Sequence, residues 1–269
     1  MKSEISANQS DYKEMIEQNR KLNQLYTAII KCNKSIIKSQ NREELFDEIC
    51  KNAINFGNMQ MAWIGVVDHD KEEIVPVAYH GEGVEYIRDL KISIDPSNDL
   101  SKGPTGQAYL EEKPYWCQNF LQDSATLKWR KKSRKFEWGS SVALPLKCCD
   151  EVVAVLNLYT KEVDNFNEEI KNLLIEVSED ISYGLNTFKQ KEMREIAESK
   201  LISSNNLLKT IINTIPIRIF WKNLNSEYEG CNLAFAQDAG ESSTDSLIGK
   251  KDDQLSMEKQ CKTLLCLRQ

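Results

Sequence analysis

The chain has 269 residues, of which 41% are apolar and 28% are charged, and its formal net charge is -6. This length and composition predict one or two globular domains and exclude a disordered chain. The negative charge argues against wide contact with nucleic acid or with an anionic membrane surface. No apolar run approaches the roughly 18 residues of a membrane span, and the polar, acidic N-terminus is not typical of a signal peptide. We expect a soluble, cytoplasmic protein.

The eight cysteines are scattered along the chain, and no Cys-x-x-Cys pair occurs. A secreted disulfide framework would be denser and its chain shorter, so reduced thiols are expected. The two histidines, His69 and His80, offer few ligands for a Cys/His zinc cage,. The sequence therefore predicts no metal site.

Residues 10–40 are predicted to form one long helix, because the stretch contains neither Gly nor Pro,. Apolar residues recur there at the two positions of a seven-residue repeat: Met15, Leu22, Leu25, Ile29, Cys32 and Ile36. The repeat has two explanations. Either an amphipathic helix packs on its own domain, or a seam of heptads pairs with a second chain in a parallel dimer. We favour the dimer.

A second helix is predicted to begin at Asn41, which forms a capping pattern with Glu44 three residues later,. The period then changes from helical to strand-like. Residues 61–68 and 73–81 are predicted to form a hairpin, and residues 90–95 a short third strand.

A short helix is predicted to begin at Gly103-Pro104, since Pro is favoured in the first turn,. The segment Gly103–Gly106 is not followed by the Lys of a P-loop, and its glycines do not have the spacing of a dinucleotide-binding motif. A structural turn is therefore expected. A short strand at 114–119 and a polar connection at 120–137, rich in Lys and Arg, follow.

Residues 140–148 and 151–160 are predicted to form a second hairpin, and Asn165, with Glu168 three residues on, to cap a long closing helix,. The apolar positions of this helix follow the spacing of a coiled coil: Ile170, Leu174, Val177, Ile181, Gly184 and Phe188,. The helix is expected to run on to Pro216.

Two short strands, at 217–223 and 226–232, are predicted after Pro216,. Helices thus flank hairpins and short strands along the chain, without a regular β-α-β alternation. This order predicts the α+β class with a mostly antiparallel sheet.

Four stretches together resemble the GAF domains of bacterial and archaeal sensor proteins: residues 62–68, 101–119, 138–146 and 151–185. They are most similar to the GAF domains that precede diguanylate cyclase, phosphodiesterase or histidine kinase outputs. The resemblance implies a central, mostly antiparallel sheet flanked by helices, with long signalling helices at both ends.

Residues 211–256 resemble the opening half of a PAS domain, in a helix followed by a strand that ends at Trp221-Lys222. Such a domain needs three more strands, so the PAS part is expected to be truncated. The predicted organisation has four parts: a coiled-coil-like helix (1–40), the GAF domain (41–188), a linker helix (189–210) and the truncated PAS domain (211–269).

The resemblance implies a ligand pocket between the sheet and the 120–137 connection. Its candidate wall residues are aromatic and are equally explained as core residues: Trp63, Tyr79, Trp116 and Trp138. Such a site suits a small organic or planar ligand. Arg130, anchored by Trp129, is a candidate for holding an anionic ligand at the pocket mouth. The run of Lys and Arg around it is also typical of a solvated loop.

Cys117 is a further candidate for the pocket, for bilin attachment or for a redox switch, although the motifs that surround the cysteine in phytochrome-like GAF domains are absent. His80 is a candidate haem ligand, with a surface histidine as the alternative, since no haem motif surrounds it. Cys148 and Cys149 are either reactive thiols or small residues at the end of a hairpin,.

The sequence predicts no catalytic residues and names no cofactor. We expect a sensory module in which a small ligand shifts the packing of the helix at 165–200. The signal would pass through dimeric helices to an output domain outside this chain, such as a histidine kinase or a cyclic-di-GMP enzyme. Two alternatives remain. One is a redox enzyme similar to GAF-fold free methionine sulfoxide reductases, which needs two close, reactive cysteines. The other is a ligand-free dimerisation module whose pocket is filled by aromatic side chains.

Overall fold

The computed structural model describes residues 2–88 and 90–255, and side chains from Tyr12 onward except those of residues 13, 14, 17, 132 and 133. The chain divides into two compact units, Met1–Glu192 and Met193–Gln269.

An antiparallel sheet is the centre of the first unit, where the described residues form five strands in the order β2-β1-β5-β4-β3. The strands are β1 (Met61–Asp68), β2 (Glu73–Gly81), β3 (Tyr115–Cys117), β4 (Ser140–Cys148) and β5 (Glu151–Thr160). The predicted α+β class and both predicted hairpins are confirmed.

The central strands β1, β5 and β4 are buried on both faces over most of their length. Their sequences are therefore runs of apolar residues rather than an alternation of polar and apolar ones. Both faces of the sheet must be covered.

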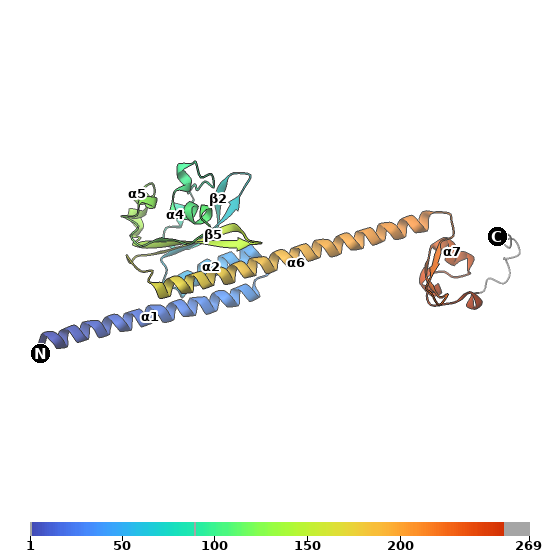
Figure 1. Ribbon diagram of the computed structural model, residues 1–269, viewed down its shortest axis with the longest axis horizontal. Coiled ribbons are helices and arrows are strands. Elements are labelled where there is room, and N and C mark those ends of the chain that lie inside the picture. Colours follow the sequence, from blue (N-terminus) through green and yellow to red (C-terminus); the bar gives the residue numbers. More distant parts are fainter. Residues whose placement is uncertain (1, 89, 256–269) are drawn as a thin grey trace. The chain divides into compact units, whose positions relative to one another are not determined.

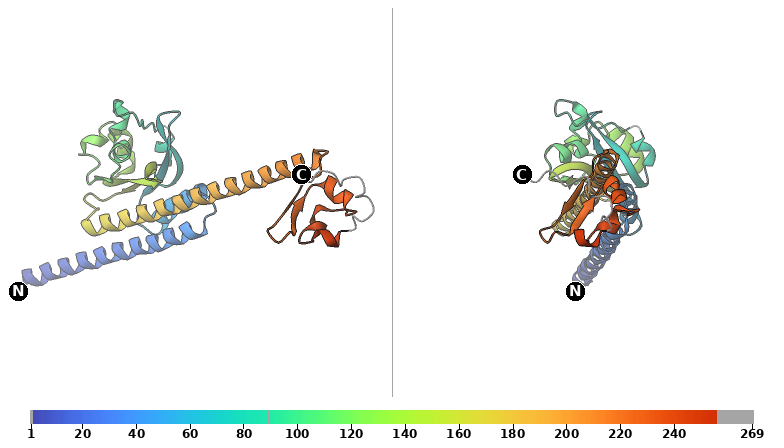
Figure 2. Two further views of the ribbon diagram at one scale, coloured as in Figure 1. Left: turned by 45° about the vertical axis from the view of Figure 1, so that its right-hand side comes forward. Right: turned by 90° about the vertical axis from the view of Figure 1, so that its right-hand side faces the viewer.

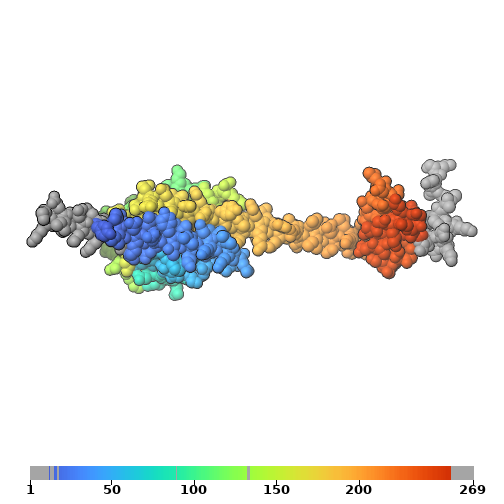
Figure 3. All heavy atoms as spheres, turned by 90° about the horizontal axis from the view of Figure 1, so that it is seen from below, coloured from blue at the N-terminus to red at the C-terminus, as the bar shows by residue number. Residues whose placement is uncertain are grey.

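Helices cover one face of this sheet (Figures 1 and 2). They are α1 (Lys2–Lys38), α2 (Arg42–Asn55) and the first half of α6 (Glu168–Thr214). Leu45 and Ile49 of α2 and Ile181 of α6 pack in one cluster with Leu144 and Leu156 of the sheet. Seen from below, α1 and α6 lie side by side across this layer (Figure 3).

The seven-residue repeat on α1 packs within the chain. Leu25 and Cys32 are buried in the helical layer, and Ile29 and Ile36 pack against it. The intramolecular explanation of the repeat is therefore the one that the structure shows over these residues. We favoured a dimer seam for these residues, but the same side chains would then have to face a second chain, and here they pack against the core of their own chain.

The N-termini of α2 and α6 are both capped by Asn. Asn41 Oδ1 accepts a hydrogen bond from the Glu44 N–H at 2.9 Å, as predicted. The cap of α6 is Asn167, whose Oδ1 accepts from the Ile170 N–H at 2.9 Å, and not Asn165. Phe166 stays outside the helix because its backbone N–H and C=O both bond to the Gln118 side chain.

The opposite face of the sheet is covered by connections that contain short helices: α3 (Val84–Ile87), α4 (Pro104–Leu110) and α5 (Arg130–Ser133). The predicted start of a helix at Pro104 is confirmed. The predicted strand at 90–95 is wrong. Only Ser93 bridges to Glu73, and the chain then turns away as the Asp95 side chain accepts from Ser97.

The second unit contains the end of α6, a two-stranded sheet of β6 (Phe220–Lys222) and β7 (Tyr228–Cys231), and α7 (Leu233–Asp238). Asn232 organises it. Its Oδ1 caps α7 at the Phe235 N–H, and its Nδ2 donates to the Ile217 carbonyl at 2.6 Å. The resemblance to a PAS domain stays a prediction, and its last part, residues 256–269, lies outside the described residues. No helix in the described ranges is long and apolar enough to span a membrane.

Gly184 permits the close approach of α6 and α1. A Cβ at this position would lie 2.9 Å from Cγ2 of Ile36 and 3.6 Å from Cδ2 of Leu45. Because the β-branched Ile36 is stiff at χ1, the contact leaves little room for a side chain.

We expect Gly184→Leu to lower the free energy of unfolding by about 1–3 kcal/mol, because it overpacks this contact. Tyr183→Leu, one residue earlier on an exposed position, is the control and should stay within about 0.5 kcal/mol of the wild type. Urea denaturation measures both. Equal stability of Gly184→Leu and the wild type would show that α1 does not pack on α6 at this point.

Candidate functional site

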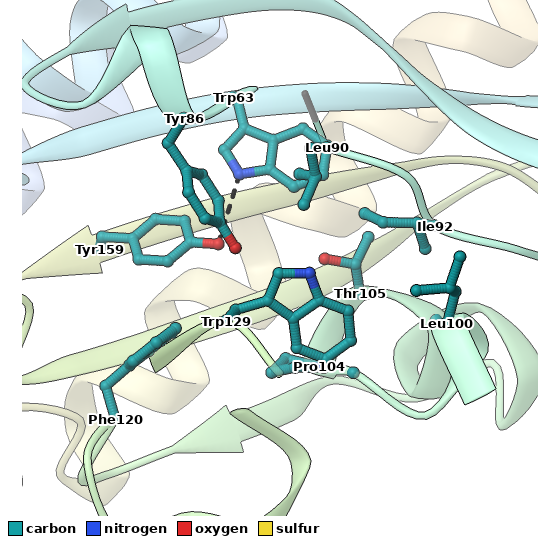
Figure 4. A pocket seen from close by; sticks show the side chains of 12 residues that line it. Trp63, Tyr86, Leu90, Ile92, Leu100, Pro104, Thr105, Phe120, Trp129 and Tyr159 are labelled. Carbon is teal, nitrogen blue, oxygen red and sulfur yellow. Dashed lines mark hydrogen bonds between the residues drawn. The ribbon is translucent and has the colours of Figure 1, made fainter. Parts of the chain in front are cut away.

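A cavity lies on the sheet face opposite the helical layer (Figure 4). Its floor is formed by Trp63 of β1 and Tyr159 of β5, and the connections after β2 and β3 close it. The free volume is about 20 Å³, which is room for about one water molecule. The cavity is therefore nearly filled by its own side chains.

Two phenols and an indole provide the polar groups of the floor. Trp63 is fully buried, and its Nε1–H donates to the Tyr159 hydroxyl at 3.4 Å. Tyr86, from α3, also lines the cavity with its phenol ring (Figure 4). Burial raises the pKa of Tyr159 to about 12 and that of Tyr86 well above its ordinary value. Both phenols therefore stay protonated at neutral pH and can donate hydrogen bonds.

Thr105 fixes α4 to the sheet at the edge of the cavity. Its Oγ1 donates to Asn157 Oδ1 at 2.7 Å, and Asn157 Nδ2 donates to the Val155 carbonyl at 3.1 Å. These buried polar groups satisfy each other, so the short helix is held in one place on the sheet.

Trp129 closes the cavity from the 120–137 connection. Its indole lies against Gly103, where an added Cβ would come within 2.4 Å of Cη2 of the ring. Gly103 is thus the residue that lets the indole lie flat over the start of α4.

Trp63 and Trp129 are the predicted site residues that line the cavity. Trp138 lies in the layer behind, with its ring centroid 4.4 Å from that of Tyr159 and 5.1 Å from that of Tyr86. Its Nε1 is buried and has no hydrogen-bond partner among the described residues.

Cys117 and Trp116 lie on opposite faces of β3, because neighbouring residues of a strand alternate between faces. Cys117 is fully buried on the cavity side, and burial raises the pKa of its thiol to about 12. Trp116 packs on the helix side, with its ring 5.7 Å from that of Phe166. The predicted pair therefore does not meet in one pocket.

Tyr79 and Arg130 also lie away from the cavity walls. Tyr79 is exposed on β2 and borders a separate groove of about 300 Å³ along that strand. Arg130 braces its own connection: Nη2 donates to the Asp123 carbonyl at 2.6 Å and Nε to Thr126 Oγ1 at 3.3 Å. A role for Arg130 in holding an anion stays a prediction.

Sequence reasoning did not assign the other lining residues to the site, among them Tyr86, Thr105, Phe120 and Tyr159. Of these four, only Tyr159 carried a signal, as a residue with a hydroxyl group inside an apolar strand. Tyr86 and Phe120 lie in connections whose sequence has no periodicity, so nothing local placed them over the sheet.

The remaining hypotheses concern residues on the helix side or at the surface. His80 Nε2 lies 2.8 Å from Asp47 Oδ1, between β2 and α2, and does not border the cavity. Cys149 is exposed at the β4–β5 turn, where its N–H donates to Asn186 Oδ1 at 2.7 Å. Within the described part of the chain, no group of three or more His, Cys, Asp or Glu residues is placed to hold a metal ion.

Residues 39–186, more than half of the chain, match the GAF domain family. The chain therefore belongs to this family. The match includes the whole five-stranded sheet and the cavity. No curated protein matches the chain.

Solved structures with the same fold include GAF domains of two phosphoenolpyruvate-protein phosphotransferases. That from Coxiella burnetii is 14% identical, with a TM-score of 0.53 over 64% of this chain and 98% of that one. That from Acinetobacter is 14% identical, with a TM-score of 0.50 over 63% and 98%. The free methionine-R-sulfoxide reductase of Neisseria meningitidis, in complex with its substrate, is 12% identical, with a TM-score of 0.52 over 61% and 89%. At these identities the likeness shows the fold alone.

Burial should set the reactivity of the described thiols. At pH 8 we expect iodoacetamide to alkylate the exposed Cys149 and to leave Cys117 unmodified, because the raised pKa of Cys117 keeps its thiol protonated,. Peptide mass spectrometry after a short exposure measures both sites, and the same reaction in urea is the control that Cys117 can react. Equal labelling of Cys117 and Cys149 in the folded protein would show that Cys117 is accessible and would support a redox role.

Proposed function

We propose that this GAF domain is the non-catalytic sensory part of a signal-transduction protein and binds a small ligand in the cavity above Trp63 and Tyr159. The observation that carries the proposal is the cavity lining. It consists of aromatic and aliphatic side chains, Thr105 and two protonated phenols, and its described residues include no charged side chain and no thiol. This composition suits recognition of a small organic molecule. Acid–base or nucleophilic catalysis would need a group poised to react near neutral pH.

The sheet provides the route by which ligand binding reaches the helices. On β5, Tyr159 faces the cavity while the neighbouring Leu158 packs into the helical core. At the end of β4, the Lys147 N–H donates to Ser182 Oγ of α6 at 2.9 Å. A shift of these strands would therefore change the packing of α6, which continues without a break to Thr214,.

A second copy of the chain is the partner that we propose for α1. Although the repeat from Leu22 to Ile36 is buried or partly buried, other apolar side chains of this helix remain exposed: Tyr12, Met15, Ile16, Tyr26, Ile30 and Ile37. Their burial in a parallel pair of helices would form a homodimer. We further propose a cytoplasmic location, a PAS-like fold for the described residues 211–255 and an output domain, such as a histidine kinase or a cyclic-di-GMP enzyme, as the recipient of the signal.

The redox-enzyme alternative finds less support. The similar fold of the sulfoxide reductase does not transfer its activity, and the described cysteines do not gather at the cavity. Cys117 is on the cavity side, whereas Cys32 and Cys50 lie in the helical core. The adjacent Cys148 and Cys149 are at the β4–β5 turn and do not line the cavity. The small free volume favours the other alternative, a ligand-free module, as long as the cavity stays closed.

One set of measurements on the whole chain tests the proposed function. Native mass spectrometry should show twice the chain mass. A panel of uncharged aromatic metabolites should contain compounds that raise the melting temperature and also change amide exchange in residues 168–192 of α6, because the strands transmit binding to that helix.

Tyr159→Phe should weaken the binding of these compounds about tenfold through the loss of one hydrogen bond. Tyr109→Phe, outside the lining, is the control. A monomeric chain that no compound stabilises would contradict the proposal.

A further inference from the structure

The space that a ligand would need is occupied by the chain itself. The Trp129 indole lies on Gly103, with ring atoms 2.4 to 3.2 Å from the position of an added Cβ, and about 20 Å³ remains free beside it. A ligand larger than a water molecule needs more room than this, and departure of the half-buried Trp129 ring would provide it. We propose that Trp129 is a built-in competitor, and that the cavity binds a flat, uncharged aromatic ring by displacing the Trp129 indole. This inference rests on the proposed function and deepens it.

The attachment of Trp129 permits this displacement. The main chain at this turn is fixed, since the Trp129 N–H donates to the Thr126 carbonyl at 2.9 Å and Arg130 bonds to Asp123 and Thr126. Rotation about the side-chain torsions of Trp129 would therefore move the indole off Gly103 without moving its backbone. A half-buried ring on a short loop requires less rearrangement than a residue inside the helical layer.

Two ion pairs connect the 120–137 connection to other segments that cover the cavity, and they contribute little resistance to its opening. Lys128 Nζ lies 3.1 Å from Asp99 Oδ2, and Lys135 Nζ lies 3.0 Å from Glu85 Oε1, with both members of each pair well exposed. Exposed pairs of this kind contribute about 0–1 kcal/mol each. They do not lock the cover over the cavity.

The walls around the indole define the class of ligand. Leu90, Ile92 and Pro104 provide apolar surfaces for a flat ring, and no described lining residue is charged. Tyr86 and Tyr159 present phenol hydroxyls that remain protonated at neutral pH. A ligand that replaces the indole would therefore gain from a hydrogen-bond acceptor on its ring, and a charged group would be left without a partner.

Calorimetric titration with two probes of nearly equal shape tests the inference. Benzimidazole has a ring nitrogen that accepts a hydrogen bond, whereas indole has no such atom. In Trp129→Ala we expect benzimidazole to bind about tenfold more tightly than in the wild type, because the competing ring is gone. It should also bind more tightly than indole does. Trp221→Ala, which removes a partly exposed indole from the second unit, is the control and should bind as the wild type does.

Gly103→Ala provides a second variant in case Trp129→Ala folds poorly. Its added Cβ should push the indole off the start of α4 and so raise benzimidazole affinity while Trp129 remains present. The inference is overturned if neither variant binds benzimidazole more tightly than the wild type, or if Trp221→Ala gains as much affinity as Trp129→Ala does.

The failure of this inference can be told from that of the proposed function. If neither variant gains affinity but compounds from the metabolite panel still change exchange in α6, Trp129 displacement is wrong and the sensory role stands. If both variants gain affinity but bound benzimidazole leaves α6 exchange unchanged, the displacement is supported and the relay through α6 is contradicted.

Discussion

The structure of the first unit depends on a sheet whose central strands are apolar on both faces. Such strands exclude water only if each face is covered. The amphipathic helices α1, α2 and α6 cover one face, and they interlock closely enough that Gly184 has no room for a side chain. The other face is covered by the connections between strands, which contain short helices only. One covering is thus made of long packed helices and the other of loops with short helices; in the function proposed above, the loop side binds the ligand and the helical side transmits the signal.

The cavity follows from the weaker covering. Loops can close over a sheet with aromatic side chains, but they leave polar groups such as the Tyr86 and Tyr159 hydroxyls inside. These groups carry no charge at neutral pH, as is usual for a phenol, and burial raises their pKa values further. Trp129, whose indole Gly103 accommodates, closes the cavity together with other residues of the connections. If a ligand binds as proposed, it competes with the closed state for the same space, and the ligand-free module and the sensor are two states of one domain.

Features set by local chemistry could be predicted from the sequence. The two hairpins were evident from strand-like runs bounded by turns, and the Asn41 cap from its spacing to Glu44. The seven-residue repeat on α1 was also evident. Such a repeat does not show which surface its apolar residues will contact, and in this chain they pack in its own core. In the site, strand alternation alone separates Trp116 from Cys117. Tyr86 could not be predicted, because a tertiary contact places it over the sheet.

Native-state hydrogen exchange of the whole chain, resolved by residue, tests most directly whether the two coverings differ. The account predicts that amides of β5 and α2 exchange only through global unfolding. Amides of residues 120–137 should exchange through local openings of much lower free energy, while the helical layer stays intact. If the amides of 120–137 exchanged as slowly as those of β5, the two coverings would not differ in stability, and the account would be contradicted.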